Sequence, residues 1–408
     1  MPALEPVAPA RFVPFSLFHR DWFNRVFGAL GMDGRRAGVL LRCVALVGVT
    51  WVPMAVLAAA QGLVGTTIDA RNFFADYAAY AQFLLAVPLF VLAEQVVGLR
   101  TREAARDFDE SGVVAPEDRA AVSRIHVAVR RMRLARRPEI AAVALAFILS
   151  FFTIGPEVVG AGPAATWHTA GAGSGVWTLP GGLTLAGAWL MFVALPILNY
   201  VWLRLIWKIV IWTFYLYRIS RLGLRLVASH PDMTGGIGFI SEVQARWAIV
   251  IFAYGISNVA AVIAYKVGIE GASPWLMPVW APAVLFAIVA PSLFTLPLLM
   301  FTRQLYRVKR RAQASLREHT RRHAAAVEAT WFGPSHRDGA PLADVSDLNN
   351  VAAAFARIQQ MRVVPFDLRS FAQLIGSTIG SIATALPIVR FEGTLEDWLS
   401  LVATLLGR

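Results

Sequence analysis

Residues 370–386 read SFAQLIGSTIGSIATAL, a run apolar enough to enter a lipid bilayer yet dotted with small polar side chains. The hydroxyl and amide side chains recur every three or four positions, at Ser370, Gln373, Ser377, Ser381 and Thr384. This spacing places them on one face of a helix. Gly376 and Gly380 form a GxxxG pattern on a neighbouring face, and this pattern lets two membrane helices approach closely.

Two interpretations of this helix are open. A membrane helix surrounded by lipid does not spread polar atoms along its length, because each atom needs a hydrogen-bond partner there. In the first interpretation, the polar face lines a water path while the small-residue face packs against a neighbouring helix. In the second, the helix is buried in a bundle and its hydroxyls bond to the carbonyls of the preceding turn.

The composition predicts an all-α polytopic membrane protein. Hydrophobic residues make up 57% of the chain and charged residues only 16%, and the mean hydropathy is +0.57. The apolar residues lie in long runs instead of alternating with polar ones. A net charge of +12 can indicate nucleic-acid binding, but here the arginines flank the apolar runs, as the positive-inside rule requires. The expected partner is the lipid bilayer, and no nucleic acid is predicted.

We predict about seven spans, with a cytoplasmic N-terminus and a periplasmic C-terminus. The predicted segments are an interfacial stretch at 1–36, a six-span membrane bundle at 37–301, a cytoplasmic helical region at 302–365, a short last span at 366–390 and an amphipathic tail at 391–408. The cytoplasmic loops of the bundle are expected at 98–139 and 216–246. Richness in alanine, arginine and glycine suggests a bacterium, and then its inner membrane.

Two of the predicted spans are longer than a bilayer requires. A bilayer core takes about 20 helical residues. The fourth span starts near Leu183, however, and its pattern continues to about Ala228. The sixth continues past Phe301 into the charged segment 302–329. We therefore expect long helix extensions on the cytoplasmic side.

The sharpest local motif is HPDMTGGIGF at 230–239, where the chain has to turn from the fourth span towards the fifth. In the structural interpretation Pro231 stops the helix, Asp232 caps the next segment, and the glycines permit positive φ angles and close packing. These glycines are Gly235, Gly236 and Gly238. In the functional interpretation His230 and Asp232 hold a cation, or the glycine amides hold an anion. Two ligands are too few for a metal, so the sequence favours the structural interpretation and predicts no metal or cofactor.

This motif, together with VVPFDLRS at 363–370, resembles an uncharacterised family of bacterial polytopic membrane proteins. That family bears an HPDxxGGxGF-like motif and a PFD-like approach to the last span, and it implies no particular activity. In architecture alone the chain also resembles insect chemoreceptor channels, which have seven spans and prolonged fourth and sixth helices. That likeness implies a tetramer, in which cytoplasmic helices anchor four subunits and the last helix lines a cation pore.

Charged residues within the predicted spans indicate an ion pair. Arg42 and Glu94 lie at similar depth near the inner ends of adjacent spans. We expect them to pair because an unpaired charge in the membrane is costly; a proton-coupling site is the alternative. The sequence shows no pattern typical of a catalytic nucleophile with its base, so no catalytic residues are predicted.

The sequence leaves three hypotheses for function. The first is an oligomeric channel for ions or small solutes, in which the last span lines the pore and cytoplasmic helices join the subunits of a homo-oligomer. The second is a membrane-embedded sensor or lipid-acting enzyme that uses His230 and Asp232. The third is a secondary transporter, against which the lack of an evident internal repeat counts modestly.

Overall fold

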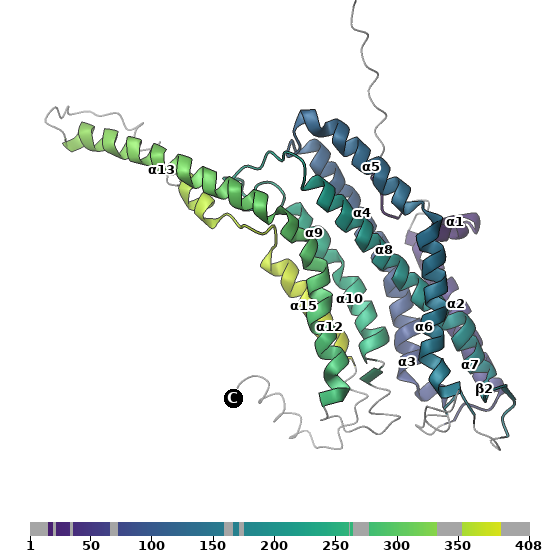
Figure 1. The fold of residues 1–408 in the computed structure, drawn as a ribbon. Coiled ribbons are helices and arrows are strands. Elements are labelled where there is room, and N and C mark those ends of the chain that lie inside the picture. The colour runs from purple at the N-terminus through teal and green to yellow at the C-terminus, as the bar shows by residue number, and fades with distance from the viewer. Residues whose placement is uncertain are drawn as a thin grey trace, which may run out of the picture.

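A computed structural model describes residues 15–18, 22–32, 36–65, 72–158, 166–170, 175–260, 262–263, 277–332 and 353–384. Within these residues the protein is a bundle of long helices with one small two-stranded hairpin (Figure 1). The predicted tail 391–408, the end of the predicted last span and most of the 1–36 segment lie outside the described residues.

Six helical stretches of the described chain are long and apolar enough to cross a membrane. They are Ala37–Ala60, Tyr77–Glu110, Pro116–Pro156, Leu185–Ile219, Phe239–Val259 and Trp280–Glu318. A further helix, α15 (Leu368–Ala383), has 16 residues; at about 1.5 Å per residue it is about 24 Å long, shorter than a bilayer core. The all-α polytopic fold predicted from the composition is confirmed.

The described elements come in the following order along the chain. In the N-terminal half they are α1 (Trp22–Ala29), α2 (Arg36–Ala60), η1 (Phe73–Ala75), α3 (Tyr77–Ala79), η2 (Tyr80–Ala86), α4 (Val87–Glu110), η3 (Pro116–Asp118), α5 (Arg119–Arg133) and α6 (Arg136–Val158). The C-terminal half adds β1 (Thr178–Leu179), β2 (Leu183–Thr184), α7 (Leu185–Trp189), η4 (Leu190–Ala194), α8 (Leu195–Ile219), α9 (Phe239–Arg246), α10 (Ala248–Tyr254), η5 (Gly255–Ala260), α12 (Met277–Thr295), η6 (Leu296–Phe301), α13 (Thr302–Phe332) and α15. Residues 353–360 are also helical.

The helix bundle has two sides and two ends that differ in the elements they carry. In Figure 1, α1, α2 and α6 lie on one side of the bundle, and α12, α13 and α15 lie on the other. The basic end is the one at which α4 and α8 terminate and at which α5 and α13 lie, and it carries most of the arginines. The β1–β2 hairpin lies at the opposite end.

The outer faces of the bundle are apolar, as lipid requires. Phe152 of α6 is 70% exposed and Leu285 of α12 is 64% exposed. An exposed face of large apolar side chains is stable against hydrocarbon, whereas in water it would be a liability. The interior holds a continuous cluster of apolar side chains, among which Trp212 and Phe108 are fully buried.

The fourth span ends earlier than the sequence analysis predicts. Its helix was expected to continue to about Ala228 and to be stopped by Pro231, but α8 ends at Ile219. The side chain of Gln304 explains the early end, because its Nε2 donates to the carbonyl of Ser220 at 2.7 Å and to that of Leu222 at 3.1 Å. A side chain from α13 thus satisfies carbonyls that a longer helix would have bonded internally.

The sixth span does continue as predicted. α12 passes through η6 into α13, a helix of 31 residues. Figure 1 shows α13 leaving the basic end sideways and extending beyond the rest of the bundle. Lys309 of α13 donates to the carbonyls of Gln359 and Met361, at 2.9 Å and 2.6 Å. These bonds hold the helical segment 353–360 against α13 and lead the chain to α15.

Candidate functional site

The start of α15 is tied to α9 by hydroxyl contacts. Ser241 of α9 accepts a hydrogen bond from the backbone N–H of Asp367 at 3.0 Å, and its Oγ lies 3.0 Å from the Oγ of Ser370. The Asp367 carboxylate accepts from Arg362 Nη1 at 2.9 Å. The segment predicted to lead into the last span is therefore anchored at the basic end.

Three hydroxyls further along this segment, those of Thr378, Ser381 and Thr384, bond to the preceding turn. Thr378 donates to the carbonyl of Leu374 at 2.9 Å, and Ser381 donates to that of Thr378 at 2.8 Å. Thr384 donates to the carbonyl of Ser381 at 2.7 Å. Each of these three hydroxyls is satisfied without water, as the buried-bundle interpretation expects.

These hydroxyls belong to a polar layer within the membrane bundle. Its members come from α3, η2, α10, η5 and α15 and are Tyr77, Gln82, Tyr254, Ser257, Asn258, Thr378, Ser381 and Thr384. Tyr77 Oη lies 3.0 Å from Thr384 Oγ1, and Gln82 Nε2 donates to the carbonyl of Ser257 at 3.0 Å. Both η2 and η5 are π-helical. The π-helix is rare in proteins overall, but where it occurs it is often at a functional site. Gly255 of η5 makes room for Ser381, because a Cβ there would collide with the serine side chain.

The opposite face of α15 is exposed and carries both small and large residues. Ala372, Gln373 and Gly376 are exposed, and nothing lies within 4 Å of the point where a Cβ on Gly376 would stand. Gly380 is half-buried, and its nearest neighbour is Phe252, 3.7 Å from that point. Leu368 and Ile379 are also exposed on this side of the helix, at 78% and 59%, so large apolar side chains flank the small ones here.

The five polar residues predicted on one side of this helix do not share one exposed side. Ser370 and Ser381 are buried, Ser377 and Thr384 are half-buried, and Gln373 is exposed. The inward hydroxyls follow the buried-bundle interpretation, while Gln373 lies on the small-residue face. A contribution of these residues to a water path stays a prediction.

The loop of the 230–239 motif is organised around Asp232. Its carboxylate accepts backbone N–H bonds from Thr234 at 2.8 Å, from Gly236 at 3.0 Å and from Gly238 at 2.9 Å. Partial burial by itself raises the pKa of Asp232, but these bonds outweigh it and hold the pKa at about 2. The carboxylate is therefore ionised at neutral pH and holds the loop in shape.

The glycines of this loop divide into two kinds. Gly235 and Gly236 have φ angles of 72° and 95°, so the prediction of positive φ is confirmed for these two. Gly238 has φ of −60°. A Cβ at Gly238 would stand 3.1 Å from Asp232 Oδ2, so this residue is needed for close packing.

The two motifs that are far apart in the sequence meet in space. The backbone N–H of Arg362 donates to the carbonyl of Met233 at 2.7 Å, and a Cβ on Gly235 would stand 3.4 Å from the Met361 side chain. The 230–239 loop therefore docks on the segment that leads into α15. Only the tertiary structure reveals this junction, since the two segments are separated by most of the C-terminal half.

His230 does not complete a metal site. Its Nδ1 lies 2.8 Å from Asp232 Oδ1, and its side chain is 43% exposed. Among the described residues no group of three or more His, Cys, Asp or Glu side chains could hold a metal ion. Because the Asp232 oxygens already bond the loop backbone, the geometry favours the structural interpretation of this motif.

A buried charged cluster lies where α1, α2, α4 and α8 meet. Arg204 makes a bidentate ion pair with Glu94, with Nη1 2.6 Å from Oε2 and Nη2 3.0 Å from Oε1. Asn24 donates to Glu94 Oε1 at 2.6 Å and accepts from Arg42 Nη1 at 2.7 Å. Lys208, one turn after Arg204, is also buried. A bidentate arginine–carboxylate pair is the strongest geometry available to such a cluster.

Arg42 and Glu94 thus belong to one cluster, linked through Asn24. The sequence analysis missed Arg204, which lies 110 positions from Glu94 in the chain. The sequence did contain a signal for it: Arg204 lies within an otherwise apolar span, and a charged side chain in such a position usually pairs with a buried partner.

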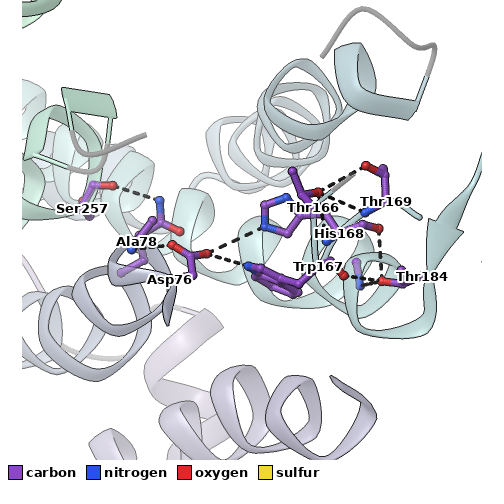
Figure 2. A network of polar contacts seen from close by, with 10 residues as sticks. Asp76, Ala78, Thr166, Trp167, His168, Thr169, Thr184 and Ser257 are labelled. Atoms are coloured by element: carbon purple, nitrogen blue, oxygen red, sulfur yellow. Dashed lines mark hydrogen bonds and ion pairs between the residues drawn. The ribbon is translucent and has the colours of Figure 1, made fainter. Parts of the chain in front are cut away.

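A second polar network, drawn in Figure 2, includes Thr184 of β2 and so lies at the hairpin end, opposite to the basic end. The Asp76 carboxylate accepts from Trp167 Nε1 at 2.9 Å, and His168 Nε2 lies 3.9 Å from it. Thr184 donates to the Trp167 carbonyl at 2.8 Å. These contacts fix the loop before the hairpin against the start of α3. This network, whose members come from segments far apart in the chain, was not predicted from the sequence.

Comparisons with known proteins found no match. No family model, no curated protein and no solved structure matches this chain. The chain's function has to be argued from its own geometry.

Proposed function

We propose that this chain is the subunit of an oligomeric membrane channel for ions or small solutes, with α15 of each subunit at the subunit contacts around a central path. The observation that carries the proposal is the exposed face of α15, with Ala372, Gln373 and Gly376. In a single chain Gln373 and Gly376 would meet lipid, which offers no hydrogen-bond partner to the amide and no close helix contact to the glycine.

Lipid and protein favour different residues on the surface of a membrane helix. Lipid gives no advantage to small residues, whereas helix–helix contacts in membranes are enriched in them because backbones approach closely there. An exposed glutamine amide in hydrocarbon costs roughly several kcal/mol unless it finds a partner or water. A neighbouring α15 or an aqueous path satisfies Gln373, and the small residues beside it suit close helix packing.

The proposed orientation places the basic end in the cytoplasm of a bacterium, by the positive-inside rule. The N-terminus is then cytoplasmic, the protein lies in the inner membrane, and the C-terminus is periplasmic if α15 and the residues after it complete a span. α13 extends in the cytoplasm on the same side of the bundle as α15, which is where helices that join subunits would have to lie.

The test combines oligomeric state with chemical accessibility. Cys43 is first replaced by Ala, and Gln373→Cys is compared with Ile288→Cys, a residue of α12 that is 64% exposed on the lipid-facing surface. We expect the purified protein to form a ring in nanodiscs. A water-soluble thiol reagent should label Gln373→Cys and block solute flux through liposomes, while Ile288→Cys stays unlabelled.

Gly376→Leu should break the assembly by overfilling a close contact, leaving the fold of each subunit intact. A monomer in nanodiscs at every protein concentration, or equal protection of both cysteines, would refute the channel.

A secondary transporter is the second candidate, favoured by the buried cluster of Glu94, Arg204 and Lys208. Buried ionisable residues inside a membrane bundle often mark ion or proton pathways. In this case Glu94→Gln should abolish proton-coupled solute uptake into liposomes while the protein remains folded. Unchanged uptake in that variant would dismiss the transporter.

A further inference from the structure

α13 carries a stripe of arginines along one face. The stripe consists of Arg303, Arg307, Arg310, Arg317 and Arg321, all of them exposed. Their steps of four, three, seven and four residues keep them on a single side of the helix. Leu305 lies on the other side and is fully buried. The side chain of Lys309, away from the stripe, holds the segment 353–361.

Most of this stripe has no carboxylate partner within the described chain. Glu318 pairs with Arg321 and Arg322. In the part of the chain that the structure describes, Arg303, Arg307 and Arg317 make no ion pair. A row of exposed like charges on a helix that leaves the bundle is unfavourable unless an anionic surface covers it.

A matching row of carboxylates lies at the basic end of the bundle. Glu103, Asp107 and Glu110 follow one another on α4 with steps of four and three residues, the same steps as Arg303, Arg307 and Arg310. Glu242 of α9 joins them, and all three glutamates are close enough to act electrostatically on Asp107. Glu103 pairs with Arg100.

These carboxylates lack arginine partners from α13 of the same chain. Within the described residues Asp107, Glu110 and Glu242 make no ion pair. α4 packs against α9, while α13 runs away from the bundle (Figure 1). At about 1.5 Å per residue its 31 residues extend about 46 Å. α13 is therefore long enough to lie over a neighbouring subunit.

We propose that the arginine stripe of α13 in one subunit lies against the carboxylate row of α4 and α9 in the next subunit. The partner is thus a second copy of this chain. The stripe and the row have opposite charges, and the charged residues of α13 and α4 follow the same helical spacing. This inference rests on the proposed oligomer and names the contact that would join its subunits. Individually such exposed pairs are weak and screened by salt, so the contact depends on several pairs acting together.

The experiment uses two differently tagged full-length chains, each with Cys43→Ala, co-expressed in one cell. One carries Arg307→Cys and the other carries Asp107→Cys, and an oxidant is added to the membranes. We expect a disulfide between the two tags. The matched control replaces Arg307→Cys with Ser315→Cys, an exposed position on another face of α13, and it should give no disulfide.

Charge reversal supplies the second measurement. Arg307→Glu alone and Asp107→Arg alone should each shift the nanodisc particles towards the monomer mass, and the double variant should restore the oligomer. The inference is overturned if the oligomer forms without the inter-chain disulfide and its mass is unchanged in both charge-reversal variants; the channel proposal then still stands. A wild-type monomer overturns both. If the oligomer forms only with anionic lipid and is unaffected by Asp107→Arg, the stripe binds lipid phosphates, and the inference is overturned as well.

Discussion

Asp232→Asn should destabilise the protein at neutral pH and have little effect in strong acid. The carboxylate accepts backbone bonds from Thr234, Gly236 and Gly238, and its pKa falls from the ordinary 3.8 to about 2. At about 1.4 kcal/mol per pKa unit, this depression corresponds to about 2.5 kcal/mol. Because the side chain is partly exposed, solvent screening reduces the expected loss to about 1–1.5 kcal/mol.

The sign of the pH dependence follows from the direction of the shift. A depressed pKa in the folded state contributes stability that is fully present above about pH 4 and is lost as the pH falls towards 2. In detergent, the wild-type unfolding midpoint should therefore drop between pH 4 and pH 2 by more than that of Asp232→Asn. The two proteins should converge at the acid end.

Asp367→Asn is a suitable control, because it removes only an exposed ion pair with Arg362, in which both side chains are 42% exposed. Its effect at pH 7 should stay below about 1 kcal/mol. Equal midpoints of Asp232→Asn and the wild type at pH 7 would refute the reasoning. So would a difference that persists unchanged at pH 2.

Two further predictions concern the loop and the charged cluster. Gly236→Val should lower the unfolding midpoint clearly more than His230→Ala, since Gly236 has φ of 95° and a branched side chain adopts that angle only with strain; a larger effect of His230→Ala would contradict this. Arg204→Met should cost about 3–5 kcal/mol by leaving Glu94 without its bidentate partner, and adding Glu94→Gln should recover part of that loss. A double variant no more stable than Arg204→Met would show that the pair is not coupled.

The helices themselves could be predicted from local sequence. Long apolar runs flanked by arginine specify membrane spans, because the bilayer imposes its thickness and apolarity on any chain that crosses it. The extension of the sixth span into α13 followed from a helical pattern that simply continued. The 230–239 loop was also recognisable, since Gly235 and Gly236 stand where positive φ angles are required.

The partners of the polar side chains were decided by the tertiary structure. The sequence shows that α15 has a hydroxyl face and a small-residue face, but it does not show which one packs against η5 and which one stays exposed. Arg204 meets Glu94 only because α4 and α8 pack side by side at that depth, and α8 ends at Ile219 where Gln304 arrives from α13. Periodicity fixes the face of a helix on which a residue lies, whereas its neighbour depends on how distant helices rotate and cross.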